Sequence, residues 1–338
     1  MVSSDDLRLT REIAAAILGA KTEEVTDVRF LRPENHSWRV VAVGSAYYVK
    51  AHTKDWYSDT PASSFPVRHE VTGYRLLREA GLPSADVVGY STSTDNPLGW
   101  PYLITRELEG APLADLLHTL SPREADAALR AVGAYLAEMH SLIYEEPGYL
   151  IDGPPNPPRP NQWLHWLSRL ERFLLHFFEN MTEDAASVDL DTRDAAASLL
   201  ERTLPRLREA YRPLRFVHGD CHANVFFLAG EGRRWRVSGL LDMENCSAGA
   251  PVFDLTKFAL EMGANYGSRL RWWEPLFQAY GAEPNFDVFR MVMVGHAHIN
   301  FVCGEPIWPG TRADILRHLL AARTWAEMFD TDRIAAGN

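Results

Sequence analysis

The stretch Phe216–Phe227, FVHGDCHANVFF, carries the most specific pattern in this chain. It places two histidines, an aspartate, a cysteine and an asparagine between apolar flanks that begin at Leu214 and end at Leu228. Such a pattern predicts a loop between two short strands, which is a common position for catalytic groups. Taken alone, the stretch is compatible with a metal site, with an activated thiol or with phosphoryl transfer.

The first two chemistries need partners that the chain does not offer in the usual pattern. His218, Cys221 and His222 supply three zinc ligands, but structural zinc sites normally pair two close ligands with two more elsewhere. His296 and His298 are two residues apart, which separates them around a helix. Cys221 has histidines near it in sequence, which does not establish a base in contact with its sulfur. A zinc-dependent hydrolase, a thiol enzyme and a plain polar turn remain as alternatives.

The segment that follows favours the third chemistry. GLLDMEN, residues 239–245, places Asp242 and Glu244 at the end of an apolar strand, either on one face or on both sides of the strand's end. Mg²⁺ binds few protein carboxylates and completes its shell with phosphate oxygens and water. An aspartate base, an amide and a metal-binding aspartate form the set of groups that moves a γ-phosphoryl group.

Composition limits the classes of protein to consider. The 338 residues suit two domains, and 46% apolar and 23% charged residues are typical of a globular protein. A net charge of −11 disfavours nucleic-acid binding because the protein repels phosphate backbones. Three cysteines give no disulfide framework. No apolar run approaches the roughly 20 residues of a membrane span, and the N-terminal segment resembles an amphipathic helix, not a signal peptide. We expect a cytoplasmic protein without nucleic-acid or membrane partners.

The first third of the chain has the pattern of a sheet with one inserted helix. The helix at residues 66–81 opens with a proline and ends with a glycine. Alternating and β-branched residues predict strands at 27–33, 38–52, 86–92 and 100–108, with a hairpin turn at Gly44-Ser45.

The remainder of the chain is mostly helical by its periodicity. A helix is expected over residues 121–143, where Ser121 and Glu124 form a capping box and Pro122 occupies the first turn. An aromatic helix follows a proline-rich loop at 153–162, and helices continue from Pro251 to the end. We therefore expect an α+β fold with a small β-rich lobe (1–108), a hinge near 105–110, and a larger, mainly α-helical lobe (109–338).

Three motifs together resemble the aminoglycoside phosphotransferase family, the small-molecule branch of the protein-kinase-like fold. HGDCHAN (218–224), LLDMEN (240–245) and GAPVFDL (249–255) stand in the order and spacing of that family's H-G-D, metal-aspartate and G-x4-D-L motifs. The resemblance reaches back through the small lobe and so covers most of the chain. It implies a bilobal protein-kinase-like fold and transfer of a phosphoryl group from ATP to a hydroxyl of a small molecule.

The resemblance assigns the catalytic loop residue by residue. It implies that Asp220 is the base that orients the acceptor hydroxyl and that His218 supports the loop. Asn224 matches the amide that positions metal and phosphate. The family usually has five residues from the aspartate to this asparagine, whereas this chain has four. Either the loop is shorter with Asn224 in the same role, or another group such as His222 takes that role.

The other two motifs supply the metal and a structural support. The resemblance implies that Asp242 is the main Mg²⁺ ligand and that Glu244 adds a direct or indirect contact to the metal. Asp254 matches a buried aspartate that braces the catalytic loop.

Two residues of the small lobe match the family's phosphate-binding pair. Lys50 lies in a predicted strand, and Glu70 borders an apolar helix stripe, where an inward carboxylate needs a partner. The resemblance implies that they pair with each other. Each alone also fits an ordinary solvated residue.

Further nucleotide contacts are expected from the hinge and from the turn between the first two strands. The resemblance implies that the backbone carbonyl of Arg106 and the backbone N–H of Leu108 bond adenine. The turn that should cover the phosphates lacks the usual glycines, so the side chains of Asn35 and Ser37 are its candidate contacts. The expected nucleotide is ATP, with GTP also compatible, and the expected metal is Mg²⁺.

Candidate acceptor contacts lie in the large lobe. Trp166, Trp273 and Trp308 offer aromatic faces, and His296 and His298 offer polar groups. Each tryptophan also fits a role in packing helices together.

The acceptor is expected to be a hydroxylated antibiotic or a nucleoside-like metabolite. Alternatives are a metabolic kinase of the choline, homoserine, fructosamine or methylthioribose type, and a nucleotide-binding pseudokinase module. The chain is expected to be a monomer or a homodimer.

Overall fold

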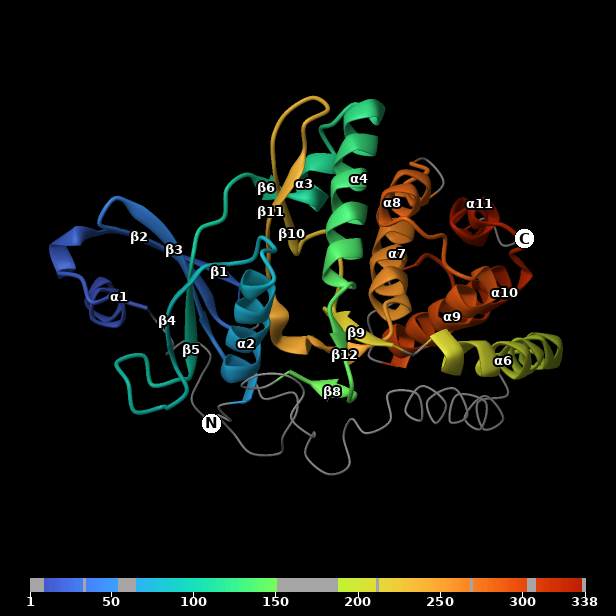
Figure 1. Ribbon diagram of the computed structural model, residues 1–338, viewed down its shortest axis with the longest axis horizontal. Coiled ribbons are helices and arrows are strands. Elements are labelled where there is room, and N and C mark those ends of the chain that lie inside the picture. The colour runs from blue at the N-terminus through green and yellow to red at the C-terminus, as the bar shows by residue number, and fades with distance from the viewer. Residues whose placement is uncertain are drawn as a thin grey trace. The chain divides into compact units, whose positions relative to one another are not determined.

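The computed structural model describes residues 9–32, 35–53, 65–150, 188–210, 213–267, 270–302 and 308–335 (Figure 1). The chain divides into two compact units. The first unit comprises Met1–Glu109, Leu150–Pro154 and Ser238–Asn245. The second comprises Gly110–Tyr149, Pro155–Val237 and Cys246–Asn338. The aromatic helix expected after the proline-rich loop lies outside the described residues.

The first unit is built on a five-stranded sheet in the order β1-β2-β3-β5-β4, and its paired strands are antiparallel. The strands are β1 (Val25–Arg32), β2 (Ser37–Ala42), β3 (Ser45–Ala51), β4 (Val87–Ser91) and β5 (Tyr102–Arg106). The hairpin turn between β2 and β3 consists of Val43 and Gly44, one residue earlier than expected, with φ of 51° and 70°. Two successive positive φ angles match the right-handed twist of the flanking strands, which explains the position of the turn.

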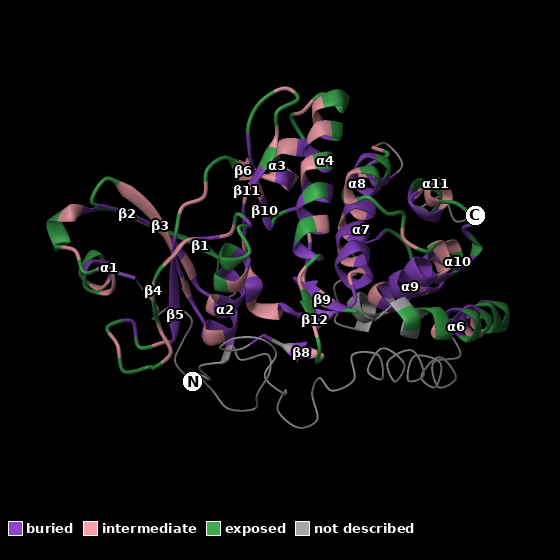
Figure 2. Cartoon of the chain, in the orientation of Figure 1, coloured by how far each residue is buried: buried purple, intermediate pink, exposed green. Residues whose placement is uncertain are grey.

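The side chains of each strand alternate between the two faces of this sheet. Trp38 and Val40 of β2 join Val49 and Ala51 of β3 in a buried core that also includes residues of α1 (Arg11–Leu18). Because successive side chains of a strand point to opposite faces, Lys50 lies on the other face. β5 is buried along nearly its whole length (Figure 2). The helix α2 (Phe65–Glu79) packs against β4 and β5.

A late segment of the chain completes the first unit. The strand β11 (Arg236–Leu240) leads from the second unit into the first, and Ala85 N–H donates to the carbonyl of Leu240 at 3.3 Å. A single 3-10 turn, η3 (Met243–Asn245), follows and packs against α2. Asp242 and Glu244 therefore lie beyond the strand's end, in the same unit as Lys50.

The second unit is mainly helical, as expected. Its helices are α3 (Leu113–Leu117), α4 (Pro122–Met139), α6 (Leu190–Ala210), α7 (Val252–Tyr266), α8 (Trp273–Tyr280), α9 (Phe286–Val302), α10 (Arg312–Ala321), α11 (Trp325–Met328) and α12 (Asp332–Ala335). α4 begins with the expected capping box of Ser121 and Glu124 but ends at Met139, four residues early. α4 packs against α8, and α7 packs against α9.

Short strands position the loop at residues 218–225. β7 (Ile143–Tyr144), β9 (Leu214–Val217), β12 (Ser247–Gly249) and β8 (Gly148–Tyr149) form a sheet in that order. β10 (Phe226–Ala229) pairs with β6 (Ala111–Pro112). Residues 218–225 connect β9 to β10, which confirms the predicted loop between two strands. None of the helices in the described part of the chain has the length and apolar character needed to cross a membrane.

Candidate functional site

One lysine of the first unit contacts three carboxylates. Lys50 Nζ lies 3.1 Å from Glu70 Oε2, 2.6 Å from Asp242 Oδ1 and 3.1 Å from Glu244 Oε2. We refer to these four residues as the lysine cluster. The cluster contains the expected Lys50–Glu70 pair and brings both acidic residues of the LLDMEN motif to the same ammonium group.

Tyr74 ties two members of the lysine cluster together, and the sequence argument did not identify it. It stands four residues after Glu70 on α2, so both side chains lie on one face of the helix. Its hydroxyl donates to Glu70 Oε1 at 2.9 Å and accepts from the backbone N–H of Asp242 at 2.8 Å. Asp242 has a φ of 64°, a strained value for a residue other than glycine, and this contact helps to hold it there.

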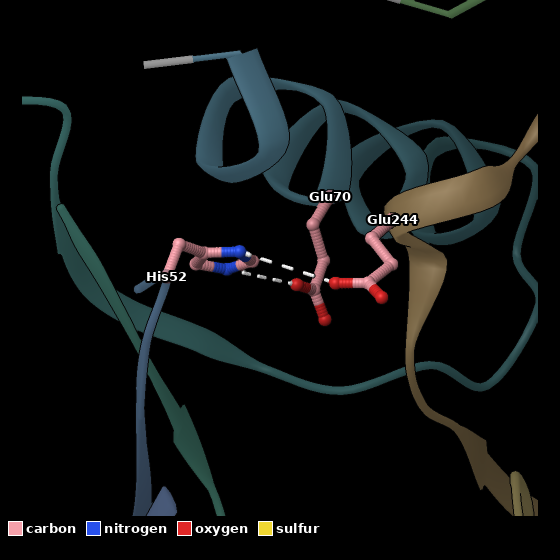
Figure 3. A group of neighbouring side chains, drawn as sticks. All are labelled: His52, Glu70 and Glu244. Atoms are coloured by element: carbon pink, nitrogen blue, oxygen red, sulfur yellow. Dashed lines mark ion pairs between the residues drawn. The ribbon is translucent and has the colours of Figure 1, made fainter. Parts of the chain in front are cut away.

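His52, the residue after the end of β3, adds an imidazole ring beside the lysine cluster. Figure 3 shows its ring turned toward two carboxylates, with Nε2 3.2 Å from Glu70 Oε2 and Nδ1 3.9 Å from Glu244 Oε2. The ring is almost fully buried. One ligand atom from each of the three residues lies within 4.8 Å of the others, a spacing compatible with a bound cation. The Lys50 ammonium already contacts both carboxylates of this group.

The charges of the lysine cluster do not balance. Burial lowers the pKa of Lys50, but the surrounding carboxylates outweigh burial and hold this pKa well above its ordinary value. Burial raises the pKa of Glu70, but Lys50 and then His52 lower it overall. Burial raises the pKa of Glu244, and the neighbouring carboxylates add to that increase. Three carboxylates face one ammonium, so a divalent cation with oxygen ligands fits the excess negative charge.

The turn between β1 and β2 lies against the lysine cluster. Asn35 Nδ2 donates to Glu244 Oε2 at 3.1 Å, and Ser37 Oγ donates to the backbone oxygen of Asn35 at 2.8 Å. His69 Nδ1 lies 2.9 Å from the backbone oxygen of Glu244. Asn35 is thus adjacent to the candidate metal ligands, while the hydroxyl of Ser37 stabilises the turn. A contact of either side chain with phosphate stays a prediction.

The two hinge residues lie at the end of the first unit's sheet. Arg106 is the last residue of β5, and its backbone N–H donates to Asp86 O at 2.9 Å. Leu108 packs against Gly239 of β11, where an added Cβ would lie 2.4 Å from Leu108 Cδ2. The expected backbone contacts of Arg106 and Leu108 with adenine stay a prediction.

In the second unit, a buried aspartate holds the start of the aspartate loop, residues 218–224. Asp254 of α7 accepts the backbone N–H of His218 at 2.7 Å and that of Gly219 at 2.8 Å. His140 Nε2 lies 3.1 Å from Asp254 Oδ2, and its Nδ1 lies 3.0 Å from the hydroxyl of Tyr280. Burial raises the pKa of Asp254, but the hydrogen bond from His140 and the charges nearby lower it overall. This geometry matches the bracing role implied for Asp254.

Asp220 follows directly and has its own support. Its backbone N–H donates to His218 Nδ1 at 3.2 Å, which gives His218 a supporting contact within the loop. Its carboxylate Oδ1 lies 3.0 Å from Lys257 Nζ, with 34% of the Asp220 side chain exposed. Sequence reasoning missed Lys257. Its position three residues after Asp254, on the same helix face, was the available signal.

Three further residues of the aspartate loop, Cys221, His222 and Asn224, concern the zinc and thiol alternatives and the choice of metal-positioning residue. Asn224 is exposed, so its side chain is accessible to a ligand. His222 Nδ1 lies 3.7 Å from Glu261 Oε2. Cys221 is fully buried, and burial, followed by nearby carboxylates, raises the pKa of its thiol, which opposes an activated nucleophile. Among the described residues, the loop's histidines and cysteine form no group with metal-binding geometry.

Two of the candidate acceptor residues are packed inside the second unit. Trp273 is 3% exposed, and its ring centroid lies 5.2 Å from that of Phe329. Trp308 is equally buried, and its Nε1 donates to the backbone oxygen of Leu260 at 2.6 Å. Gly263 makes room for it, because an added Cβ there would lie 2.6 Å from the Trp308 ring. Both residues take the alternative role of packing helices together.

His296 lies in α9 with its Nδ1 buried. Its pKa is lowered to about 4 by burial first and then by the cation of Lys257, with Asp220 acting in the opposite direction. This residue therefore belongs to the surroundings of Asp220. Trp166 and the side chain of His298 lie outside what the structure describes.

A model of the phosphotransferase enzyme family matches residues 32–292. No curated protein matches the chain.

Solved structures similar to this chain are aminoglycoside phosphotransferases. A thermostable mutant of APH(4)-Ia in ternary complex with AMP-PNP and hygromycin B shares 16% identity, over 92% of this chain and 94% of that one, at a TM-score of 0.51. The streptomycin–ATP–APH(2″)-IIa ternary complex shares 13% identity, over 93% of this chain and 92% of that one, at a TM-score of 0.52. The GDP complex of an aminoglycoside 2′-phosphotransferase-IIIa mutant shares 12% identity, over 93% of this chain and 91% of that one, at a TM-score of 0.57. These likenesses confirm the expected protein-kinase-like fold.

Proposed function

The chain belongs to the phosphotransferase enzyme family, and we propose that it moves the γ-phosphoryl group of ATP onto a hydroxyl group of a small molecule. The observation that carries this proposal is the lysine cluster, in which Lys50 lies within 3.1 Å of all three carboxylates. An ammonium paired with a buried glutamate, beside two further carboxylates, offers both a phosphate-binding cation and oxygen ligands for a metal.

In this proposal the first unit binds the nucleotide. Lys50 binds phosphate oxygens, and Glu70 holds its ammonium in place. Asp242 and Glu244 would hold Mg²⁺, and Asn224 of the aspartate loop stays a predicted further ligand. A metal held there would supply positive charge that stabilises the phosphoryl group during transfer. The backbone of Arg106 and Leu108 binds the base, and Asn35 and Ser37 line the phosphates.

The second unit presents the acceptor. Asp220 is held through its backbone and through Lys257, and its partly exposed carboxylate accepts the hydrogen bond of the attacking hydroxyl. The carboxylate orients that hydroxyl for direct in-line transfer, so that most of the catalysis comes from positioning and charge.

An antibiotic is the acceptor class that the comparisons favour. Similar structures contain hygromycin B or streptomycin together with a nucleotide or its analogue. A net charge of −11 also suits a cationic acceptor. A hydroxylated antibiotic or nucleoside-like metabolite remains our expectation for the acceptor, and both ATP and GTP are tested as donors because one similar structure holds GDP.

A mass-shift screen tests the proposal. Purified protein is incubated with Mg²⁺, with ATP or GTP, and with a panel of hydroxylated antibiotics and metabolites such as choline, homoserine and methylthioribose. We expect one class of acceptor to gain the mass of a single phosphoryl group, with stoichiometric loss of nucleotide triphosphate. Tight nucleotide binding without any product across the panel would instead indicate a nucleotide-binding module.

A further inference from the structure

Helix α7 contacts the aspartate loop at successive points along one face. Asp254 binds the backbone at the start of the loop, and Lys257, three residues later, reaches Asp220. Glu261, four residues further on, lies 3.7 Å from His222. Residues spaced by three and four lie on one side of a helix, so the anchor at Asp254 also fixes where Lys257 meets the loop.

Lys257 and Asp220 form a close, partly buried ion pair. The distance from Lys257 Nζ to Asp220 Oδ1 is 3.0 Å, and 26% of the lysine side chain is exposed. The titratable groups around the pair come from more than one element, since the ring of His296 on α9 also lies in the field of Lys257 and Asp220.

We propose that Lys257 is a positioning residue for phosphoryl transfer, which holds Asp220 through Oδ1 and leaves Oδ2 to the acceptor hydroxyl. This inference rests on the proposed function. In the step it serves, the acceptor oxygen forms a bond to the γ-phosphorus and the bond from phosphorus to the β–γ bridging oxygen breaks. ADP leaves with that electron pair, and the hydroxyl proton passes to Asp220 Oδ2.

A positioning role and a purely structural ion pair predict different effects of removing Lys257. A partly exposed ion pair contributes little to folding stability, so removing the lysine should leave the unfolding temperature nearly unchanged. Misplacing a catalytic group by as little as an ångström, in contrast, lowers the rate of reaction strongly. Nucleotide affinity should not change, because the partner of Lys257 is Asp220, which the proposed function assigns to the acceptor and not to the nucleotide.

Steady-state kinetics of Lys257→Met and Lys257→Arg test the role. We expect Lys257→Met to lower kcat about 100-fold with an unchanged Kd for ATP, since positioning of this kind affects the reaction step. Lys257→Arg keeps the cation and should recover at least about tenfold of that loss. Arg333→Met is the matched control, because it removes another ion pair of the second unit, with Asp330 at 2.8 Å, and should keep wild-type kcat.

The outcomes separate this inference from the proposed function. If the wild-type chain transfers phosphate and Lys257→Met does so at the same rate, the role of Lys257 is wrong and the proposed function stands. A kcat loss that Lys257→Arg does not recover, or a Kd for ATP raised more than about tenfold, also overturns the positioning role. If the wild-type chain transfers phosphate to no acceptor, both proposals are wrong.

Discussion

His296 shows how one residue of the second unit responds to its surroundings. It lies in the field of both Lys257 and Asp220, and its Nδ1 is buried. Burial, aided by the lysine, lowers its pKa to about 4 from an ordinary value near 6.5. The folded protein therefore keeps this imidazole neutral, although a lysine–aspartate ion pair lies nearby.

The stability of the fold should consequently fall as the pH decreases below about 6.5, because the unfolded chain protonates His296 more readily than the folded chain does. Between pH 7 and pH 5 this residue should lower the free energy of unfolding by about 2 kcal/mol, and the loss should level off below about pH 4. Urea unfolding of the wild type and of His296→Gln at both pH values measures the difference. Equal pH dependence in the two proteins would contradict the shifted pKa.

Lys50 should matter more for ligand binding than any exposed lysine of the first unit. Lys50→Met removes the ammonium from three carboxylates and should weaken ATP binding by at least about 1.5 kcal/mol, the value of a hydrogen bond to a charged group. Lys21→Met is the control, since Lys21 is exposed and lies at the start of a 3-10 turn. Isothermal titration calorimetry of both variants checks the prediction. Equal affinity in the two would show that Lys50 does not contact the nucleotide.

The sequence allowed the main residues of the lysine cluster to be predicted, but not their supports. The residue pattern placed Lys50 in a strand and Glu70 at the border of a helix stripe, and the family resemblance implied both their pairing and the role of Asp242. Tyr74 and Lys257 were missed, because helix spacing places them beside Glu70 and Asp254 but does not show that they reach Asp242 and Asp220, which are distant in sequence. Trp273 and Trp308 were expected at the acceptor site but pack inside the second unit, since aromatic residues satisfy either role in sequence.

At the scale of the elements, α4 packs closely against α8 at a glycine. A Cβ added at Gly133 would lie 2.3 Å from the backbone oxygen of Leu276 and 3.2 Å from the side chain of Ala279. A backbone oxygen in a helix cannot move aside as a flexible side chain can. The glycine is therefore required by packing, although glycine is a poor helix former.

Gly133→Ala should destabilise the second unit by about 1–3 kcal/mol, the range for overpacking, despite the better helix propensity of alanine. The neighbouring exposed residue offers a control: Ala134→Gly should cost about 1 kcal/mol through helix propensity alone. Denaturant unfolding of the two variants gives both values. A stabilised Gly133→Ala protein would contradict the close packing of α4 on α8.

Element boundaries were predictable where local chemistry is strong. The capping box at Ser121 marked the start of α4, and the apolar flanks of the aspartate loop marked β9 and β10. The end of α4 and the hairpin turn were misplaced by a few residues. The turn lies at Val43-Gly44 because the twist of paired strands determines which residues take positive φ, even at the cost of an exposed valine.

On the scale of the whole chain, the first unit draws on distant parts of the sequence. Ser238–Asn245 brings Asp242 and Glu244 to a sheet formed by the first 109 residues. The sequence predicted two lobes that are each continuous along the chain, 1–108 and 109–338. No local pattern indicates that residues 238–245 belong to the first unit, although they lie within the range of the second lobe. The charge excess of the lysine cluster depends on this arrangement.

Metal and nucleotide should therefore stabilise the protein together. Mg²⁺ with ATP at about 100 times its Kd should raise the free energy of unfolding by about 2.7 kcal/mol, and EDTA should remove most of that gain. Asp242→Asn should retain a response to ATP alone but lose the part that depends on Mg²⁺. Thermal unfolding with ATP, with Mg²⁺ and ATP, and with EDTA measures each contribution. A gain that is unaffected by EDTA would contradict a metal at these carboxylates.

The central claim, that Asp220 directs a phosphoryl group onto a hydroxyl, is tested most directly by ³¹P NMR of the acceptor found in the mass-shift screen. Wild-type protein should convert the γ-phosphate resonance of ATP into one phosphomonoester resonance, with ADP in equal amount. Asp220→Asn should bind ATP with unchanged affinity and lower the rate of phosphomonoester formation by about 10³-fold. Phosphomonoester formed by Asp220→Asn at the wild-type rate, or ATP converted only to inorganic phosphate by the wild type, would contradict the claim.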